Sequence, residues 1–216
     1  MNNIKKLRFL AILSIFTAII IIMTFTRIGF INLIIINATI VHIPVIIGSI
    51  VLGARGGAIL GFMFGFSSFL NATLNPGLTS FAFSPLIPIP GQTHGTIWAL
   101  AIAFIPRIMV GVIPSLVYNF LKNLFNPKSK NKFDIINIAI AAIIGSFTNT
   151  ILVLSGFFIF IREELTVALY IGANEIFAWL LSIVLSSGVA EAIAASIISI
   201  AICIPIFNYT KSNKSI

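Results

Sequence analysis

The sequence predicts an all-α membrane protein: a single domain over residues 1–216, built as a six-transmembrane-helix bundle with N-terminus and C-terminus cytoplasmic. Hydrophobic residues make up 59% of the chain and charged residues only 8%, whereas soluble domains carry about 25% charged residues. Apolar runs are long enough to cross a hydrocarbon core, which takes about 20 residues. Transmembrane β-barrels alternate apolar and polar residues in segments of about 10, and this alternation is missing. The spanning elements are therefore expected to be helices.

Turn signals between the apolar runs predict the helix positions. The second run contains Asn37 and Pro44 and ends at the turn around Gly53, and Asn75-Pro76-Gly77 ends the third. The predicted helices cover residues 7–25, 38–53, 58–74, 96–121, 135–161 and 187–208. Segments 75–95 and 162–186 are predicted to be extracellular or interfacial, and the hydrophilic segment 122–134 is predicted to be a cytoplasmic linker.

The last part of the chain, residues 165–207, allows two interpretations. It has room for two spanning helices broken at Ser186-Ser187-Gly188, or for one helix preceded by an outer segment. Basic residues decide between them, because the positive-inside rule places them in the cytoplasm. Ten of the 13 Lys and Arg residues flank apolar runs: Lys5, Lys6, Arg8, Arg55, Lys122, Lys128, Lys130, Lys132, Lys211 and Lys214. Only an even number of crossings keeps all of them inside, which favours six helices over seven. The net charge of +8 therefore indicates membrane orientation, and no nucleic acid partner is expected.

Small residues spaced by four predict close helix contacts. Gly53, Gly57, Gly61 and Gly65 place a stripe on one face of the third helix, where two backbones can approach each other in lipid. Packing inside the bundle is the favoured interpretation, and contact with another membrane protein remains the alternative.

Motifs of common enzymes are missing from the chain. It has no G-x-x-x-x-G-K phosphate loop, no H-E-x-x-H zinc motif and no Gly-x-Ser-x-Gly elbow. Cys203 is the only cysteine, so an intrachain disulfide and a thiolate metal site are excluded. We therefore expect no enzyme activity, no cofactor and no metal.

Polar residues at membrane depth point to function. Arg107 lies about eleven residues into its predicted helix, roughly 16 Å from the outer end. A charge at this depth is costly and marks a ligand or a buried partner, and a guanidinium binds a carboxylate through two parallel hydrogen bonds. Glu191, Asn149 and Asn71 are predicted to face the same outward region. An Arg107–Glu191 ion pair and interhelical amide bonds are the structural alternatives.

Two further residues are candidates for the same site. His42 precedes Pro44 and is either a ligand contact or a structural histidine with its hydrogen bonds satisfied. Phe83, in the predicted outer loop, is placed to cover an apolar part of a ligand, although aromatic residues are also common at membrane interfaces.

The segments that contain these residues resemble a known family. The resemblance rests on residues 42–53, 56–67, 79–88 and 149–153, and on Pro106-Arg107 with Gly111. In this order and spacing they are similar to the S component, the substrate-binding subunit, of energy-coupling factor (ECF) vitamin transporters, and most similar to its pantothenate-specific members. The resemblance covers almost the whole chain.

The resemblance implies a substrate-capture subunit in a bacterial plasma membrane. It implies a six-helix bundle with both termini inside and a vitamin site near the outer face, and as partners a transmembrane coupling subunit and two cytoplasmic ATPases. The first helix of such proteins carries a small-x-x-x-small patch for the coupling subunit, and Ser14 and Ala18 are the nearest match here. Arg107 would then bind the carboxylate of pantothenate, with Asn149 and Asn71 at its amide and hydroxyls.

Three alternatives remain open at this point. The first is an S component for riboflavin, thiamine, folate or biotin. The second is a self-sufficient secondary transporter, although such proteins usually contain internal repeats and midplane ion sites, which the chain lacks. The third is a scaffolding membrane protein without a ligand, which leaves Arg107 unexplained.

Overall fold

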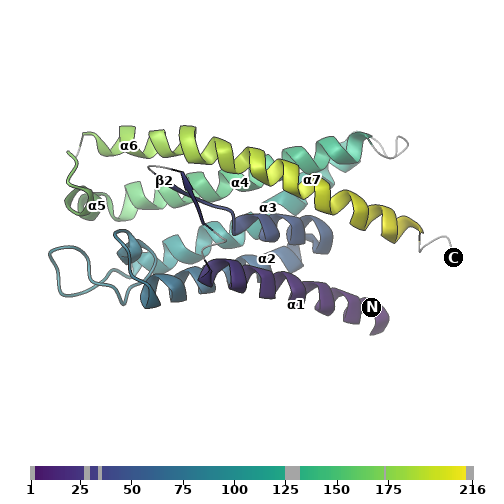
Figure 1. The fold of residues 1–216 in the computed structure, drawn as a ribbon, viewed down its shortest axis with the longest axis horizontal. Coiled ribbons are helices and arrows are strands. Elements are labelled where there is room, and N and C mark those ends of the chain that lie inside the picture. Colours follow the sequence, from purple (N-terminus) through teal and green to yellow (C-terminus); the bar gives the residue numbers. More distant parts are fainter. Residues whose placement is uncertain (1–2, 27–29, 34–35, 125–131, 173, 213–216) are drawn as a thin grey trace.

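A computed structural model describes residues 3–26, 30–33, 36–124, 132–172 and 174–212. Its helices form an elongated bundle along one axis (Figure 1). The elements in chain order are α1 (Asn3–Phe25), β1 (Phe30–Leu33), β2 (Ile36–Thr39), α2 (His42–Leu74), the 3₁₀ turn η2 (Ser80–Ala82), α3 (Trp98–Leu124), α4 (Lys132–Phe160), α5 (Arg162–Leu169), α6 (Ile176–Ile183), the π turn η3 (Val184–Gly188) and α7 (Val189–Ser212).

Helix α2 is a helical hairpin. Its chain reverses at Gly53, where φ is 82°, a conformation that glycine adopts without the steric cost of a Cβ. The two arms then run antiparallel, because Gly48 contacts Leu60 and Ser49 contacts Gly57. Within the described residues five helices are long and apolar enough to cross a membrane, and one of them, α2, is folded into two arms at Gly53.

The first arm of α2 begins later than the helix expected over 38–53. Residues 30–39 form the β1–β2 hairpin instead, with Phe30 opposite Thr39. Isoleucine-rich segments favour strands because β-branched side chains fit a pleated surface. Pro44 falls in the first turn of the helix that starts at His42, where the missing N–H costs no helical hydrogen bond. Pro44 thus marks the start of this helix and does not interrupt it.

The last pass begins earlier than the helix expected over 187–208. A continuous apolar span runs over Ile176–Tyr209, through the serines at which the predicted outer segment meets the predicted helix. The chain accommodates them as the π turn η3, and the Ser182 and Ser186 hydroxyls donate to main-chain carbonyls three and four residues earlier, those of Trp179 and Ser182. Serine hydroxyls that bond to their own helix let the helix continue without a chain reversal.

The glycine stripe packs within the bundle, against α3. A Cβ added at Gly57 would collide with the carbonyl oxygen of Gly111, and one added at Gly111 would collide with that of Gly57. Gly61 lies in the same way against the backbone of Arg107, and Gly65 against that of Ala103. This backbone contact fixes the position of α3 and thereby of Arg107.

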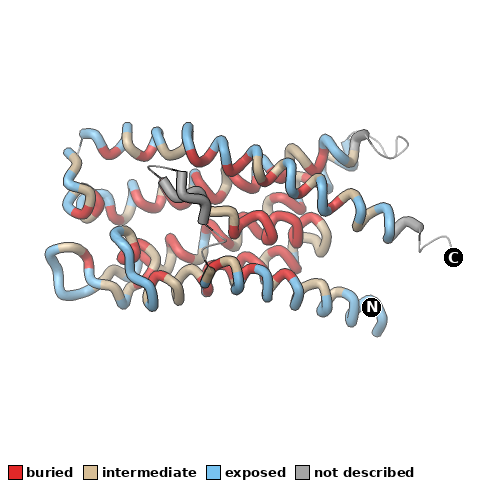
Figure 2. The backbone as a smooth tube through the Cα atoms, in the orientation of Figure 1, coloured by how far each residue is buried: buried red, intermediate tan, exposed pale blue. Residues whose placement is uncertain are grey.

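Helix α1 lies on the outside of the bundle. Only Phe16, Ile20 and Thr24 are buried along its length, and most of the helix is exposed in Figure 2. Ser14 and Ala18 are on the exposed side.

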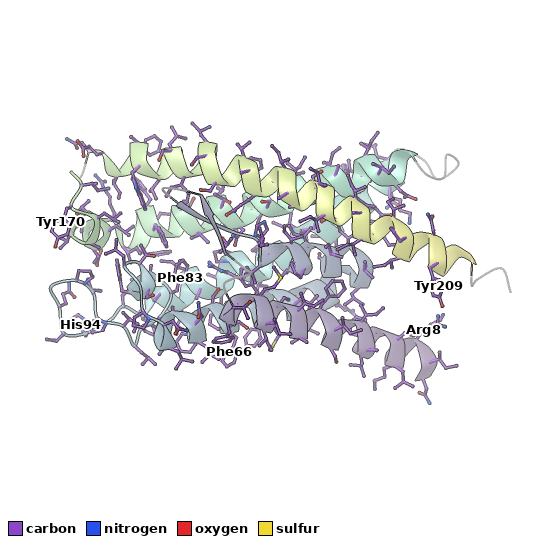
Figure 3. The ribbon with its side chains drawn as sticks, viewed as in Figure 1. Arg8, Phe66, Phe83, His94, Tyr170 and Tyr209 are labelled. Carbon is purple, nitrogen blue, oxygen red and sulfur yellow. The ribbon has the colours of Figure 1, made fainter. Side chains whose placement is uncertain are left out.

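Both termini lie at the same end of the bundle (Figure 1). Arg8 and Tyr209 mark this end in Figure 3, and Phe83, His94 and Tyr170 lie toward the other end. Lys128 and Lys130 of the predicted linker, and Lys214, lie outside the described residues.

Candidate functional site

Arg107 is buried in the bundle, with only 7% of its surface exposed. Its Nη1 donates a hydrogen bond of 2.9 Å to the carbonyl oxygen of Ile102. This carbonyl lies four residues before Pro106, which has no N–H to donate to it. The Pro-Arg pair therefore creates a free helical acceptor and supplies the donor that uses it, which holds the guanidinium in place.

Two aromatic rings also surround the guanidinium, and one of its nitrogens has no hydrogen-bond partner among the described residues. Its central carbon lies 4.8 Å from the centre of the Phe83 ring and 5.4 Å from that of Phe64, distances at which a cation is attracted to a ring. Nε has no hydrogen-bond partner among the described residues. A buried cation held by one carbonyl and two rings has unused capacity for an anion.

Glu191 does not supply this anion. It is 6% exposed, and its Oε1 accepts hydrogen bonds from the backbone N–H of Thr39 at 2.8 Å and from the Thr39 hydroxyl at 3.4 Å. The Thr150 hydroxyl is also within hydrogen-bonding reach. No ion pair joins Arg107 to Glu191 in the part of the chain that the structure describes, so the ion-pair alternative does not account for either residue.

His42 is fully buried at the start of α2. Its Nε2 lies 3.1 Å from the Ser146 hydroxyl of α4, and its Nδ1 has no partner within the described chain. Arg107 is close enough to interact with it electrostatically. Nε2 thus anchors His42 to α4, and the ring also lies within reach of the Thr39 backbone.

The structure separates the two asparagines. Asn149, one turn after Ser146 on α4, is 7% exposed and its Oδ1 has no partner among the described residues. Asn71 is only half-buried, and its Oδ1 already accepts a hydrogen bond of 2.9 Å from Asn75 at the end of α2. Asn149 is therefore buried and polar like Arg107, His42 and Glu191. No hydrogen bond found for Asn71 connects it to these residues.

Phe83 comes to the site from the loop after η2. It stands over Arg107 and contacts Phe157 of α4, with ring centres 5.6 Å apart. The loop is fastened below it, since the Ser84 and Thr73 hydroxyls are 2.8 Å apart. Phe83 thus packs on Arg107, and it lies toward the end of the bundle opposite the termini (Figure 3).

Sequence reasoning missed some members of this group. Thr39 and Ser146 each carry a hydroxyl that bonds to a predicted site residue, and Phe64 provides the second ring for Arg107. A signal was available for Thr39 and Ser146, because both are polar residues inside otherwise apolar runs.

An apolar groove of about 230 Å³ lies apart from this group. It is formed by α4 and by the helix from α6 into η3, and is lined by Ile151, Leu154, Ser155, Phe158, Ile159, Phe177, Leu180, Leu181 and Val184. Ile151, Phe158 and Phe177 are exposed, so the groove opens on the outer surface and takes no part in the buried polar site.

The sequence matches a known family along almost the whole chain. The model of the family "ECF transporter, substrate-specific component" matches residues 8–203. The chain belongs to this family. A relative named pantothenic acid transporter PanT, from Lactococcus lactis subsp. cremoris (strain MG1363), is 39% identical over 207 residues, which cover 94% of this chain and 95% of the relative.

The chain is thus an S component, a transport protein and not an enzyme. With its apolar spans it is a multi-pass protein of the bacterial plasma membrane. The family implies a vitamin as substrate and an ECF module as partner. The resemblance inferred from the sequence is confirmed.

Proposed function

We propose that this S component binds pantothenate for ATP-driven uptake. The observation that supports this most is Arg107, a buried cation without an anionic partner in the described chain. Burying an unpaired charge is expensive, and a ligand carboxylate would remove the cost. Pantothenate is a small hydroxylated amide acid that is anionic at neutral pH. The relative PanT is a pantothenic acid transporter by name.

Each end of this ligand has a suitable group in the proposed site. The carboxylate would lie against Arg107, within reach of the free Nε. Nδ1 of His42 and Oδ1 of Asn149 also lack partners, and would bond to the amide and hydroxyl groups. Glu191 accepts from Thr39 through Oε1 and has the Thr150 hydroxyl within reach, and its carboxyl group would also accept from a ligand hydroxyl. Asn71 would contribute from the rim, with its amide nitrogen.

Ligand charge separates pantothenate from other vitamins. Thiamine is a cation and would be repelled by Arg107, and riboflavin carries no carboxylate to pair with it. Biotin and folate carry carboxylates and are the stronger competitors. A secondary transporter is disfavoured, because the family works with a separate energy-coupling module.

The decisive experiment is a titration of the purified protein in lipid nanodiscs with each vitamin. Pantothenate is expected to bind and to resist displacement by excess thiamine, riboflavin, biotin or folate. Failure of pantothenate to bind, or its displacement by biotin or folate at equal concentration, would refute the assignment.

The proposed orientation has six passes and both termini in the cytoplasm, which puts Phe83 and His94 at the outer end. It rests on the positive-inside placement of ten basic residues. Cysteines at Lys130 and Lys214 should resist an impermeant thiol reagent on intact cells, whereas one at His94 should react. Cys203 is buried and gives little background. The reverse labelling pattern would exclude this orientation.

The proposed partners are a transmembrane coupling subunit and two cytoplasmic ATPases. Ser14 and Ala18 are exposed on α1, and the helix buries only its opposite side. Small residues on an exposed face allow another helix to approach closely in lipid. We assign the docking of the coupling subunit to this face.

A further inference from the structure

The π turn η3 carries a buried hydroxyl to which the described residues offer no hydrogen-bond partner. Ser187 is 3% exposed, and its Oγ has no hydrogen-bond partner among the described residues. Its neighbour Ser186 is exposed and donates to the Ser182 carbonyl at 2.6 Å. Two adjacent serines on one turn are therefore in opposite states, one satisfied at the surface and one unsatisfied inside.

The turn itself points to function. A π turn adds a residue to the helical repeat, and such turns are rare and frequent at functional sites. A serine hydroxyl in a helix can donate to the carbonyl four residues earlier, as Ser186 does on this same turn. The Ser187 hydroxyl makes no such hydrogen bond, although burying an unsatisfied hydroxyl lowers stability.

The surroundings of Ser187 belong to the proposed substrate site. A Cβ added at Gly188 would lie 3.3 Å from Cγ2 of Thr150, next to Asn149. Strand β2 packs on both η3 and α7, and Thr39 of this strand holds Glu191, one turn after Ser187. Ser187 is therefore on the wall formed by η3 and α7, between α4 and β2.

We propose that Ser187 is a specificity-determining residue whose hydroxyl binds a hydroxyl group of the substrate. The proposal rests on the proposed function. Arg107 attracts the carboxylate of the ligand, and the carboxyl group of Glu191 offers acceptors that suit a hydroxyl and repel a second carboxylate. The ligand is thereby oriented with its acid end at α3 and its hydroxylated end at η3.

The test compares three alanine variants, each of which removes one serine hydroxyl. Ser187→Ala should weaken pantothenate binding by about three- to tenfold, the effect of one neutral hydrogen bond. Ser186→Ala, on the same turn but exposed, and Ser199→Ala, buried and unpartnered on α7, should bind as the wild type does. Titration calorimetry gives the dissociation constants, and thermal unfolding of each ligand-free variant shows that it is folded.

Pantothenate analogues that each lack one hydroxyl separate contact from structure. The loss caused by Ser187→Ala should disappear with one of these analogues and persist with the other. Should Ser187→Ala fail to fold, Ser187→Gly removes the same hydroxyl and takes its place. Unchanged binding by the variant, or an equal loss with every analogue, would overturn the proposal while wild-type binding of pantothenate still supports the proposed function. A wild type that does not bind pantothenate would refute the function itself.

Discussion

The α2–α3 contact and the exposed face of α1 use the same sequence pattern in opposite ways. Both have small residues four apart, Gly57 and Gly61 in one case and Ser14 and Ala18 in the other. In α2 these residues bring two backbones of the same chain together at the level of Arg107. In α1 they remain exposed. Spacing therefore predicts a close contact, and burial shows whether the chain itself supplies the partner.

The two regions also match two tasks. A binding site needs a fixed geometry, and glycine contacts provide it because backbone atoms cannot rotate away. A docking surface must remain free until its partner arrives, and α1 remains free because it buries only three residues against the rest of the bundle. Substitutions in the two regions should therefore affect different functions.

The largest expected effect comes from closing the α1 face. Ser14→Leu combined with Ala18→Leu should abolish pantothenate uptake by cells that contain the ECF module, because leucine prevents close approach of a second helix. Binding by the purified variant should equal that of the wild type. Ala178→Leu, a matched change on the exposed side of α6, should leave uptake intact. Equal loss of uptake and binding would show that the patch packs inside the bundle.

The next effect comes from separating α2 and α3. Gly57→Ala places a methyl group against the carbonyl of Gly111, and such overpacking costs about 3 kcal/mol when the neighbour cannot yield. The unfolding temperature and the binding-competent fraction should both fall. Gly77→Ala is the control, since an added Cβ there meets nothing within 4 Å. Similar behaviour of the two variants would contradict the role given to the glycine contact.

The smallest effect distinguishes the two asparagines. Asn149→Ala should weaken pantothenate binding about two- to tenfold, because its free Oδ1 is assigned to the ligand. Asn71→Ala should have a smaller effect, since Asn71 already bonds to Asn75. Calorimetry on both variants measures the difference, and the opposite ranking would move the site toward the end of α2.

The sequence pointed to candidate site residues where a residue type is rare in its surroundings, such as a charge within an apolar run. Arg107 stood out because a charge at membrane depth is costly. The glycine stripe was also readable, although its partner, Gly111, was not, since spacing does not name the facing helix. The Thr39–Glu191 contact joins residues 152 positions apart, and no local pattern encodes it.

The helix ends were harder to predict because they depend on how the chain satisfies its backbone. Pro44 was interpreted as an interruption within an apolar run, yet it occupies a first helical turn. Ser186 was predicted to end the outer segment 162–186, yet its hydroxyl bonds to its own helix. In both cases the residue suits a turn and a helix equally well, and packing in the bundle decides.

The most direct test of the account is the pairing of Arg107 with the ligand carboxylate. Removing one member of a buried charged pair costs about 2–5 kcal/mol, and each 1.4 kcal/mol is about tenfold in affinity. Arg107→Ala should therefore weaken pantothenate binding by well over tenfold. Arg107→Lys should restore only part of the loss, because an ammonium group lacks the bidentate geometry.

The measurement is a binding cycle with pantothenate and its uncharged analogue pantothenol, on the wild type and Arg107→Ala. Pantothenol should bind the wild type much more weakly than pantothenate does, and should lose far less on Arg107→Ala. Equal losses for the two ligands, in a variant that unfolds at the wild-type temperature, would show that Arg107 supports the bundle and does not bind the substrate.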